Sequence, residues 1–326
     1  MILVTGSAGH LGEALMRIAA ARGIAARGID LKPSPFTALT GSIADRGFVR
    51  EAMAGVTAII HTATLHKPHV ATHPAQAFVD TNVSGTLALL EAATAASARA
   101  FVLTSTTSAF GSALRPPPHA PAAWIDETVA PVPRNIYGTS KLAAEALAEL
   151  AHRRDGLPVV VLRTARFFPE GDDDPAVRAG YALDNVQVNE LLHRRADIAD
   201  VAEAHLLAVA RASAVGFARL IVSATTPFTR DDVAELRRDA AGLVRRRVPS
   251  AAPVFDARGW RFFPAIDRVY DNEAARTTLG WRPVHDFAAA VAAVGEGRDF
   301  RSALARAVGA KGYHGPGVDP GPYAPV

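Results

Sequence analysis

A glycine-rich turn near the N-terminal end of the chain limits the possible folds more than any other feature of the sequence. A short apolar segment, Ile2 to Thr5, leads directly into this turn, and a segment typical of a helix follows it. Glycines at intervals of three residues permit a tight turn, a close approach of the backbone to a diphosphate, and close packing of the helix on the strand. The first amides of that helix would face the negative charge. The sequence therefore predicts a dinucleotide site that includes Gly6, Gly9, His10, Leu11 and Gly12.

Short β-branched or apolar segments alternate with longer Ala-rich segments through roughly the first half of the chain. This alternation is typical of repeated strand and helix units that build a parallel sheet. We expect an α/β fold, with a Rossmann-type doubly wound parallel sheet and a crevice at the carboxyl ends of its strands. Long helices are expected over Pro74–Ala96 and Tyr137–His152. The expected strands are Ile2–Thr5, Ile24–Asp30, Ala58–His61, Ala100–Ser105 and Val159–Arg163.

Composition excludes several classes of site. The chain has 35 Lys and Arg against 32 Asp and Glu and no basic arm, which argues against a nucleic-acid partner. It has no cysteine, so disulfides, thiolate catalysis and cysteine metal sites are excluded. No apolar segment approaches the ~18 residues that span a bilayer, and no charged leader opens the chain, so we expect a cytoplasmic protein without a membrane partner. We expect no metal, and interpret His66, His69 and His73 as solvated residues or as part of a substrate mouth.

The predicted second strand ends in Asp30, at about the ~20 residues after the turn where dinucleotide sites carry an acidic residue. A carboxylate there accepts hydrogen bonds from both ribose hydroxyls and repels a 2′-phosphate, which favours NAD over NADP. Lys32 weakens this preference slightly. The alternative is that Asp30 only caps a turn.

Tyr137 and Lys141 are four residues apart, so on a helix they share one face. A phenol titrates near ~10 and needs a neighbouring cation before it works as a base near neutral pH. Three hydroxyl residues, Thr106, Thr107 and Ser108, follow a predicted strand at its carboxyl end, where α/β active sites form. The sequence therefore predicts a site for proton transfer, with a solvated tyrosine and lysine as the alternative.

Further segments allow a family resemblance to be stated. Taken with the glycine turn and the Tyr137 and Lys141 pair, they make the chain similar to the extended short-chain dehydrogenase/reductase superfamily, in its NAD-dependent epimerase/dehydratase branch. The resemblance covers most of the chain. The segments are His61-Thr62-Ala63-Thr64, Asn82-Val83-Ser84-Gly85-Thr86, Asp197-Ile198-Ala199-Asp200-Val201-Ala202 and Leu279-Gly280-Trp281-Arg282-Pro283.

The resemblance implies roles for individual residues. Tyr137 is expected to act as general acid and base, and Lys141 to hold the nicotinamide ribose and to favour the phenolate. Thr106 is expected to bond the reacting oxygen, although Ser105 and Thr107 are one residue away. Asn82 is expected either near the cofactor or as a buried structural amide, and Ser42 stands where many relatives have Asp. The remaining expected cofactor residues are Ile43, Thr62, Ala63, Thr64 and Thr104.

The substrate side departs from the nucleotide-sugar pattern. Thr164 stands where relatives usually have an asparagine, and only about two dozen residues separate Asp172 from Asp197, which favours a smaller substrate. Arg166 is expected to bind an anion, or else to pair with the carboxylates of residues 172–174. The expected substrate residues are Thr107, Arg166 and Asn185.

Three functions remain open at this point. The first is hydride transfer through NAD at a secondary hydroxyl of a sugar or nucleotide sugar, as in an epimerase. The second is an NAD-dependent dehydrogenase or carbonyl reductase of a small sugar acid, lactone or other alcohol. The third is a non-catalytic NAD-sensing protein on the same fold. Dehydration is disfavoured, because Thr107 and Ser108 supply no carboxylate beside the expected active-site threonine.

The expected organisation has three parts. Residues 1–165 are expected to form an NAD-binding Rossmann domain that carries the catalytic tyrosine and lysine. Residues 166–308 are expected to form mainly a smaller C-terminal substrate lobe, with elements that return to the sheet, and residues 309–326 a Gly/Pro-rich tail. By family analogy the two long helices would pair with those of a second copy in a homodimer.

Overall fold

A seven-stranded parallel sheet organises the computed structural model, which describes residues 1–172 and 174–311. The strand order is β3-β2-β1-β4-β5-β7-β8, so the chain reverses its direction of travel across the sheet between β1 and β4. This topology confirms the expected doubly wound fold. The strands are β1 (Ile2–Thr5), β2 (Ala26–Asp30), β3 (Leu39–Thr40), β4 (Ala58–His61), β5 (Phe101–Thr106), β7 (Val159–Thr164) and β8 (Phe217–Val222).

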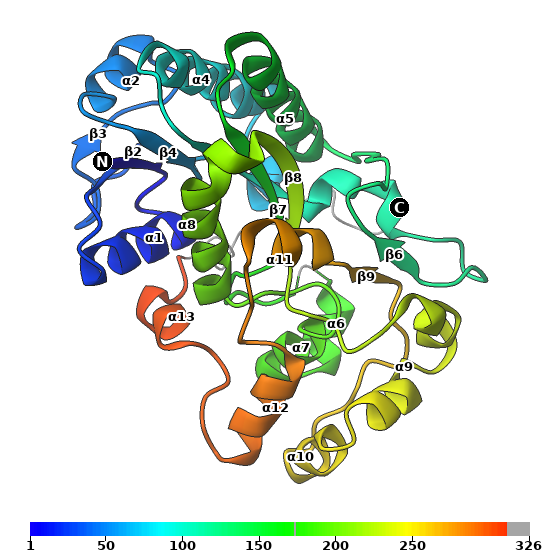
Figure 1. Ribbon diagram of the computed structural model, residues 1–326. Helices are drawn as coiled ribbons and strands as arrows, with labels where there is room; N and C mark the ends of the chain where they lie inside the picture. Colours follow the sequence, from blue (N-terminus) through cyan, green and yellow to red (C-terminus); the bar gives the residue numbers. More distant parts are fainter. Residues whose placement is uncertain (173, 312–326) are drawn as a thin grey trace.

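Helices cover both faces of the sheet, because successive strand residues alternate between the faces. In β1, Ile2 and Val4 belong to one core cluster, whereas Leu3 belongs to the other. Figure 1 shows the two helical layers on either side of the strands. One layer contains α1 (His10–Ala21), α8 (Ile198–Val215), α11 (Glu273–Leu279) and α13 (Ala303–Val308). The other contains α2 (Arg46–Ala52), α4 (Gly85–Ala95) and α5 (Ile136–Asp155).

The helix expected over Pro74–Ala96 is interrupted by a π-helical turn. It consists of α3 (Ala75–Phe78), the π-helical segment η2 (Val79–Ser84) and α4. A π-helical turn inserts an extra residue per turn and changes the direction of nearby side chains, which makes it common at functional sites. Asn82 is the only buried residue of η2, so this turn directs a polar side chain inward.

A lobe beyond the sheet has its own apolar core, built around Phe255, Phe262 and Phe287. Its two-stranded sheet pairs β6 (Ala123–Ile125) with β9 (Arg268–Tyr270), so a segment from the first half of the chain enters the lobe. Conversely, β8 and α8 return from the second half to the main sheet. The lobe helices are α6 (Pro175–Gly180), α7 (Leu183–Glu190), α9 (Val233–Arg247), α10 (Ala251–Ala257) and α12 (Phe287–Gly295). Elsewhere along the chain, the 3-10 segments are η1 (Lys67–Ala71), η3 (Thr107–Phe110), η4 (Ser112–Leu114) and η5 (Arg230–Asp232).

The C-terminal part of the described chain returns to the first helix. Helix α13 contacts α1 and α8, and its N-cap Ser302 donates two hydrogen bonds to Asp197, from the backbone N at 3.0 Å and from Oγ at 2.6 Å. Most of the expected Gly/Pro-rich tail, residues 312–326, lies outside the described residues. Within the described ranges, no helix is both long enough and apolar enough to cross a bilayer.

Candidate active site

A cleft of about 1250 Å³ follows the carboxyl ends of the parallel strands. Ligand sites of proteins commonly measure roughly 300–1,000 Å³, so this cleft has room for more than one small molecule. Three of the expected site residues, Asn82, Lys141 and Asn185, do not line it. The expected residues that do line it are Gly6, Gly9, His10, Leu11, Gly12, Asp30, Ser42, Ile43, Thr62, Ala63, Thr64, Thr104, Thr106, Thr107, Tyr137 and Arg166.

The glycine turn forms a compact cradle at the N-terminal end of α1. Gly6 has a φ of +73°, and a Cβ atom there would lie 2.8 Å from the backbone N of Ala63. A Cβ atom on Gly12 would lie 2.0 Å from the backbone O of Gly6. Gly9 is the N-cap of α1 and has no side chain to accept hydrogen bonds from the first helical amides. The amides and the positive end of the helix dipole are therefore suited to an anionic group such as a diphosphate.

Asp30 has two backbone partners beside this turn. Its Oδ2 accepts a hydrogen bond from the backbone N of Ala8 at 2.9 Å, and its Oδ1 accepts one from the backbone N of Lys32 at 2.9 Å. The capping role considered from the sequence is thus present. A carboxylate has about four acceptor positions, so these two bonds leave capacity for ribose hydroxyls in the cleft.

Asn82 connects the loop after β4 to helix α5 through hydrogen bonds. Its Oδ1 accepts hydrogen bonds from the backbone N of Leu65 and from Oγ1 of Thr64, each at 2.9 Å. Its Nδ2 donates to the O of Leu65 and to Oγ of Ser140, each at 2.9 Å. All four hydrogen-bonding positions of the amide are occupied. Asn82 is therefore buried with its amide fully bonded within the chain, and its place near the cofactor stays a prediction.

The two residues expected to handle protons, Tyr137 and Lys141, lie in the first turns of α5, and both are buried. Burial raises the pKa of Tyr137 to about 12, and the hydrogen bond with Thr106 opposes that shift only in part. Burial lowers the pKa of Lys141 to about 8, against the opposing effect of the Glu145 carboxylate. The phenol is thus harder to ionise than in water, contrary to the expectation from the lysine alone, because the lost hydration of the phenolate outweighs the other effects.

Hydrogen bonds distinguish the hydroxyls at the end of β5. Ser105 donates from Oγ to Glu145 Oε1 at 2.5 Å, and Thr107 donates from Oγ1 to the backbone O of Thr164 at 3.3 Å. Only Thr106 among these three acts on the ionisation of Tyr137 through a hydrogen bond. The geometry therefore supports Thr106 over its neighbours as the hydroxyl beside the phenol. Thr104 is engaged with the His205 ring, with Oγ1 2.8 Å from Nε2.

Behind the pair lies a buried ion cluster that the sequence interpretation missed. Glu145 is one helical turn beyond Lys141 and pairs with Arg163, whose Nη2 is 2.7 Å from Glu145 Oε2. Both side chains are almost fully buried. The spacing of four residues between Lys141 and Glu145 was the available signal, because it places the carboxylate on the face of the helix that carries the lysine.

The three expected substrate residues have different surroundings. Arg166 donates from Nη2 to the backbone O of Glu170 at 3.1 Å and to that of Gly171, so it holds the loop after β7. Asn185 is buried and bonds the backbone N and O of Arg261 at 3.1 and 3.0 Å. Asn185 therefore supports the lobe and is not brought to the cleft. Thr107 lines the cleft, although its hydroxyl hydrogen is directed at the backbone.

A contact network connects the glycine turn to the loop after β7 and to the C-terminal segment. His10 Nε2 lies 3.2 Å from Glu170 Oε1, and its ring meets Phe168 edge-on with centroids 5.3 Å apart. Lys311 donates from its backbone N to Glu170 Oε1 at 3.1 Å and from Nζ to Glu13. Burial alone would raise the pKa of Glu170, but the hydrogen bond and charge of His10 outweigh it and lower this pKa to about 2.

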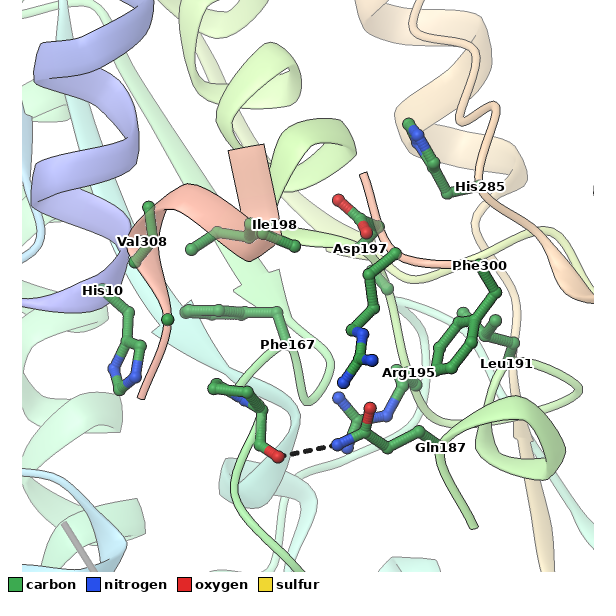
Figure 2. Close-up of a pocket in the computed structure, with 15 residues that line it drawn as sticks. His10, Phe167, Gln187, Leu191, Arg195, Asp197, Ile198, His285, Phe300 and Val308 are labelled. Carbon is green, nitrogen blue, oxygen red and sulfur yellow. Dashed lines mark hydrogen bonds between the residues drawn. The ribbon is translucent and has the colours of Figure 1, made fainter. Parts of the chain in front are cut away.

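Beside the network lies a second, much smaller cavity, of about 40 Å³. Figure 2 shows Phe167, Ile198 and Val308 on one side of it and Arg195 and Gln187 on another. Gln187 Nε2 donates to the backbone O of Pro169 at 2.7 Å. Such a volume suits a few water molecules, and we assign no ligand to it.

The loop that carries three histidines bends over the cleft. The His66 ring stacks on Phe168 with centroids 5.5 Å apart, and His69 meets His66 edge-on at 4.5 Å. The walls that follow β4 and β7 therefore touch. In the part of the chain that the structure describes, no three His, Cys, Asp or Glu side chains are grouped so as to hold a metal ion.

Comparison with known proteins yields consistent matches. A sequence model of the NAD dependent epimerase/dehydratase family matches residues 2–219. The chain is 34% identical to a dTDP-glucose 4,6-dehydratase of Streptomyces niveus over 50% of this chain and 52% of that enzyme, so it spans about half the length of this relative. It is 27% identical to a UDP-glucose 4-epimerase of Streptomyces lividans over 86% of this chain and 91% of the other. A short-chain dehydrogenase/reductase superfamily protein from Agrobacterium tumefaciens, solved with bound NAD, shares the fold with a TM-score of 0.63 and 22% identity, over 91% of this chain and 97% of that chain.

Proposed function

The chain belongs to the NAD dependent epimerase/dehydratase family, and on that premise we propose that it transfers a hydride between NAD and a carbon that bears a secondary hydroxyl of a sugar or nucleotide sugar. One observation carries the proposal. A buried tyrosine, followed one turn later by a buried lysine, lines the same cleft as Thr106 and the glycine turn. This arrangement brings a proton-transfer group and a dinucleotide cradle together.

The residues of the cleft fit NAD. The tight cradle of Gly6 and Gly12 and the uncapped start of α1 suit the diphosphate, and Asp30 retains acceptor positions for the adenosine ribose. Ser42 and Ile43 line the cleft where the family resemblance expects the adenine. NAD, when bound, supplies the hydride acceptor and donor that no side chain provides.

Side chains of the protein would transfer the proton of the substrate hydroxyl. In the proposed reaction Tyr137 acts as the phenolate: its Oη takes the proton of the substrate hydroxyl as hydride leaves the carbon, and the resulting phenol returns that proton in the reverse step. Thr106 orients the reacting oxygen. Lys141, with a pKa of about 8, is mostly protonated at neutral pH and stabilises the phenolate as it forms.

We infer epimerisation rather than dehydration from the hydroxyls beside the site. Elimination of water requires a general acid and base close to the reacting carbons, and the positions next to Thr106 are Thr107 and Ser108. Thr107 is bonded to a backbone carbonyl, and the Ser108 amide donates to Thr106 Oγ1 at 3.0 Å. These neighbours position the threonine and supply no carboxylate.

A dehydrogenase acting on a small sugar acid or lactone is the second candidate. It is favoured by the short connection between Asp172 and Asp197, whose described residues form the helices α6 and α7, of 6 and 8 residues. A short connection leaves less protein to enclose a nucleotide. A purely NAD-sensing protein is disfavoured, because the tyrosine, lysine and threonine occur together in one buried arrangement.

The test is turnover by the purified protein with NAD and pools of sugars, sugar acids and nucleotide sugars, followed by NADH absorbance and by chromatography of the sugar. A changed stereoisomer without net NADH supports the epimerase, and a rising NADH signal supports the dehydrogenase. Replacing the base, Tyr137→Phe, should reduce turnover by roughly 10²–10⁴-fold while NAD affinity is unchanged. Tyr181→Phe, in the lobe, is the matched control. Full activity of Tyr137→Phe would refute the assignment.

A further inference from the structure

Three arginines line one part of the cleft. The segments that carry Arg115 and Arg134 run side by side, since Gly111 pairs with Val132 in a parallel bridge and the backbone N of Ser112 donates to the O of Val132 at 2.8 Å. Both arginines line the cleft together with Tyr137, and Arg134 precedes this tyrosine by three residues. The paired loop segments thus bring both arginines to the cleft that Tyr137 also lines.

Arg268 adds a third guanidinium from a distant part of the chain. It begins β9 and lines the same cleft. Its Nη1 donates to both carboxylate oxygens of Asp267, at 2.9 and 2.8 Å. Its Nε is buried and has no hydrogen-bond partner among the described residues. Even this paired arginine therefore retains a donor for another group.

The cluster has an excess of positive charge. For the guanidinium groups of Arg115 and Arg134, the described part of the chain offers neither an ion pair nor a hydrogen bond, and Asp267 is the only carboxylate that acts on Arg115. Burial lowers the pKa of Arg115, and the charges of Arg134 and Arg268 lower it further, while Asp267 raises it. Arg115 and Arg134 are solvent-exposed, and positive charges grouped along a cleft attract an anion to it.

Two other arginines nearby, Arg194 and Arg195, have carboxylate partners. Arg194 pairs with Asp172 at 2.5 Å and with Glu190 at 2.9 Å. Arg195, in the neighbouring cavity, pairs with Glu190 at 2.7 Å. Arg194 and Arg195 thus each have a carboxylate partner, whereas Arg115 and Arg134 have none in the described chain.

The cluster is placed for the substrate rather than for the cofactor diphosphate. Figure 1 shows β9, which carries Arg268, on the side of the molecule opposite to β2, which ends in Asp30. The glycine turn follows β1, next to β2 in the sheet. The arginines thus lie toward the end of the cleft that is distant from the adenosine site.

We propose that Arg115, Arg134 and Arg268 bind an oxyanion of the substrate, so that the substrate is a sugar with a carboxylate or phosphate group close to the hydroxyl that Tyr137 deprotonates. Guanidinium groups bind both oxyanions through paired, charge-assisted hydrogen bonds. This inference rests on the proposed function and narrows its substrate class. The proposed anion would belong to the substrate and would be additional to the diphosphate of the cofactor.

Calorimetric titration of the NAD-loaded protein with D-glucuronate, D-glucose 6-phosphate and D-glucose tests the proposal. At least one acid should bind, more tightly than glucose, and the acid that binds identifies carboxylate or phosphate as the group. Arg115→Gln and Arg134→Gln should each weaken the binding of that acid by about 10-fold or more, because each removes a charged hydrogen bond. Arg50→Gln, an exposed arginine on α2, is the control. NAD affinity and the unfolding midpoint of each variant confirm that the fold is retained.

Three results would overturn the proposal: equal binding of glucose and both acids, no binding of either acid, or unchanged acid affinity in the double variant Arg115→Gln/Arg134→Gln. The proposed function fails separately. Tyr137-dependent turnover of a neutral sugar, without binding of either acid, would retain the function and discard the anion site. Acid binding that depends on the arginines, without turnover of any substrate, would retain the anion site and discard the proposed function.

Discussion

At the scale of single residues, the charge of Lys141 depends on a carboxylate that never reaches the cleft. Glu145 is buried and held by Arg163, and it raises the pKa of Lys141 against the larger effect of burial. Stabilisation of the Tyr137 phenolate requires the protonated lysine. In the proposed reaction, Glu145 and Arg163 would therefore act through the charge of Lys141, without touching the substrate.

Glu145→Gln should move the alkaline limb of the kcat pH profile to lower pH. The carboxylate raises the pKa of Lys141, so its removal lowers that pKa below about 8 and the lysine loses its proton earlier. Glu203→Gln is the control, because Glu203 lies on α8 and pairs with Arg22, outside this ion cluster. An alkaline limb that stays in place in Glu145→Gln, with the fold intact, would contradict this role.

At the scale of elements, the junction of β1 and α1 depends on the absence of side chains in the turn. The carbonyl of Gly6 and the site of a Cβ on Gly12 are closer than any two such atoms can be. Both are fixed to backbone, so no side-chain rotation relieves the contact. The helix can approach its strand this closely only with glycine at position 12.

Gly12→Ala should therefore weaken NAD binding by at least about 10-fold and lower the free energy of unfolding by roughly 1–3 kcal/mol, the usual range for overpacking. Titration with NAD and urea unfolding measure the two effects. Gly180→Ala, where the added Cβ would come no closer than 3.9 Å to Arg261 Nη2, is the matched control and should change neither. Wild-type affinity in Gly12→Ala would show that the turn does not form the cofactor cradle.

At the scale of the whole molecule, we predict a homodimer through the layer that contains α4 and α5. The two helices contact each other, and Val79 and Leu150 in this layer are 37% and 43% exposed. A second copy would cover these apolar side chains. Leu150→Lys should yield a monomer in light scattering, whereas Val284→Lys, at a side chain 64% exposed elsewhere, should not. A monomeric wild-type mass would refute the dimer.

Buried histidines make the whole fold sensitive to acid. Burial lowers the pKa from 6.5 to about 3 in His61 and His193, helped by the charges of Lys141 and Arg194 respectively, and to about 4 in His205. The unfolded chain takes up these protons near 6.5 and the folded chain only below about 4, so stability falls as pH decreases through this window. Glu170, with its pKa lowered to about 2, adds a further loss below 4.5.

Urea unfolding across this pH range should show a midpoint that decreases steadily below pH 6.5. Each buried histidine contributes up to roughly 1.4 kcal/mol per pH unit while only the unfolded state is protonated. His205→Gln should reduce the slope. A midpoint that is independent of pH between 6.5 and 4 would contradict the prediction.

The sequence by itself determined those features that depend on short-range spacing. Consecutive apolar residues such as Ile2, Leu3 and Val4 indicate a strand that is buried on both faces, and the glycine turn indicates its connection to a helix. Tyr137 and Lys141 share a helical face because they are four residues apart. The parallel sheet and the family were therefore predictable. The catalytic role of Tyr137 and Lys141 stays a prediction.

Only the tertiary structure decided which neighbouring groups compete for each side chain. Thr106 is distinguished from Ser105 because Glu145, 40 residues away, takes the hydroxyl of Ser105. The amide of Asn82 is fully bonded, including a bond to Ser140, 58 residues away. Arg115 and Arg134 lie on loop segments that pair at Gly111 and Val132, and Arg268 reaches the same cleft from β9. Such contacts depend on how the strands and loops are placed in space, and burial sets the resulting charges. Spacing along the chain contains neither quantity.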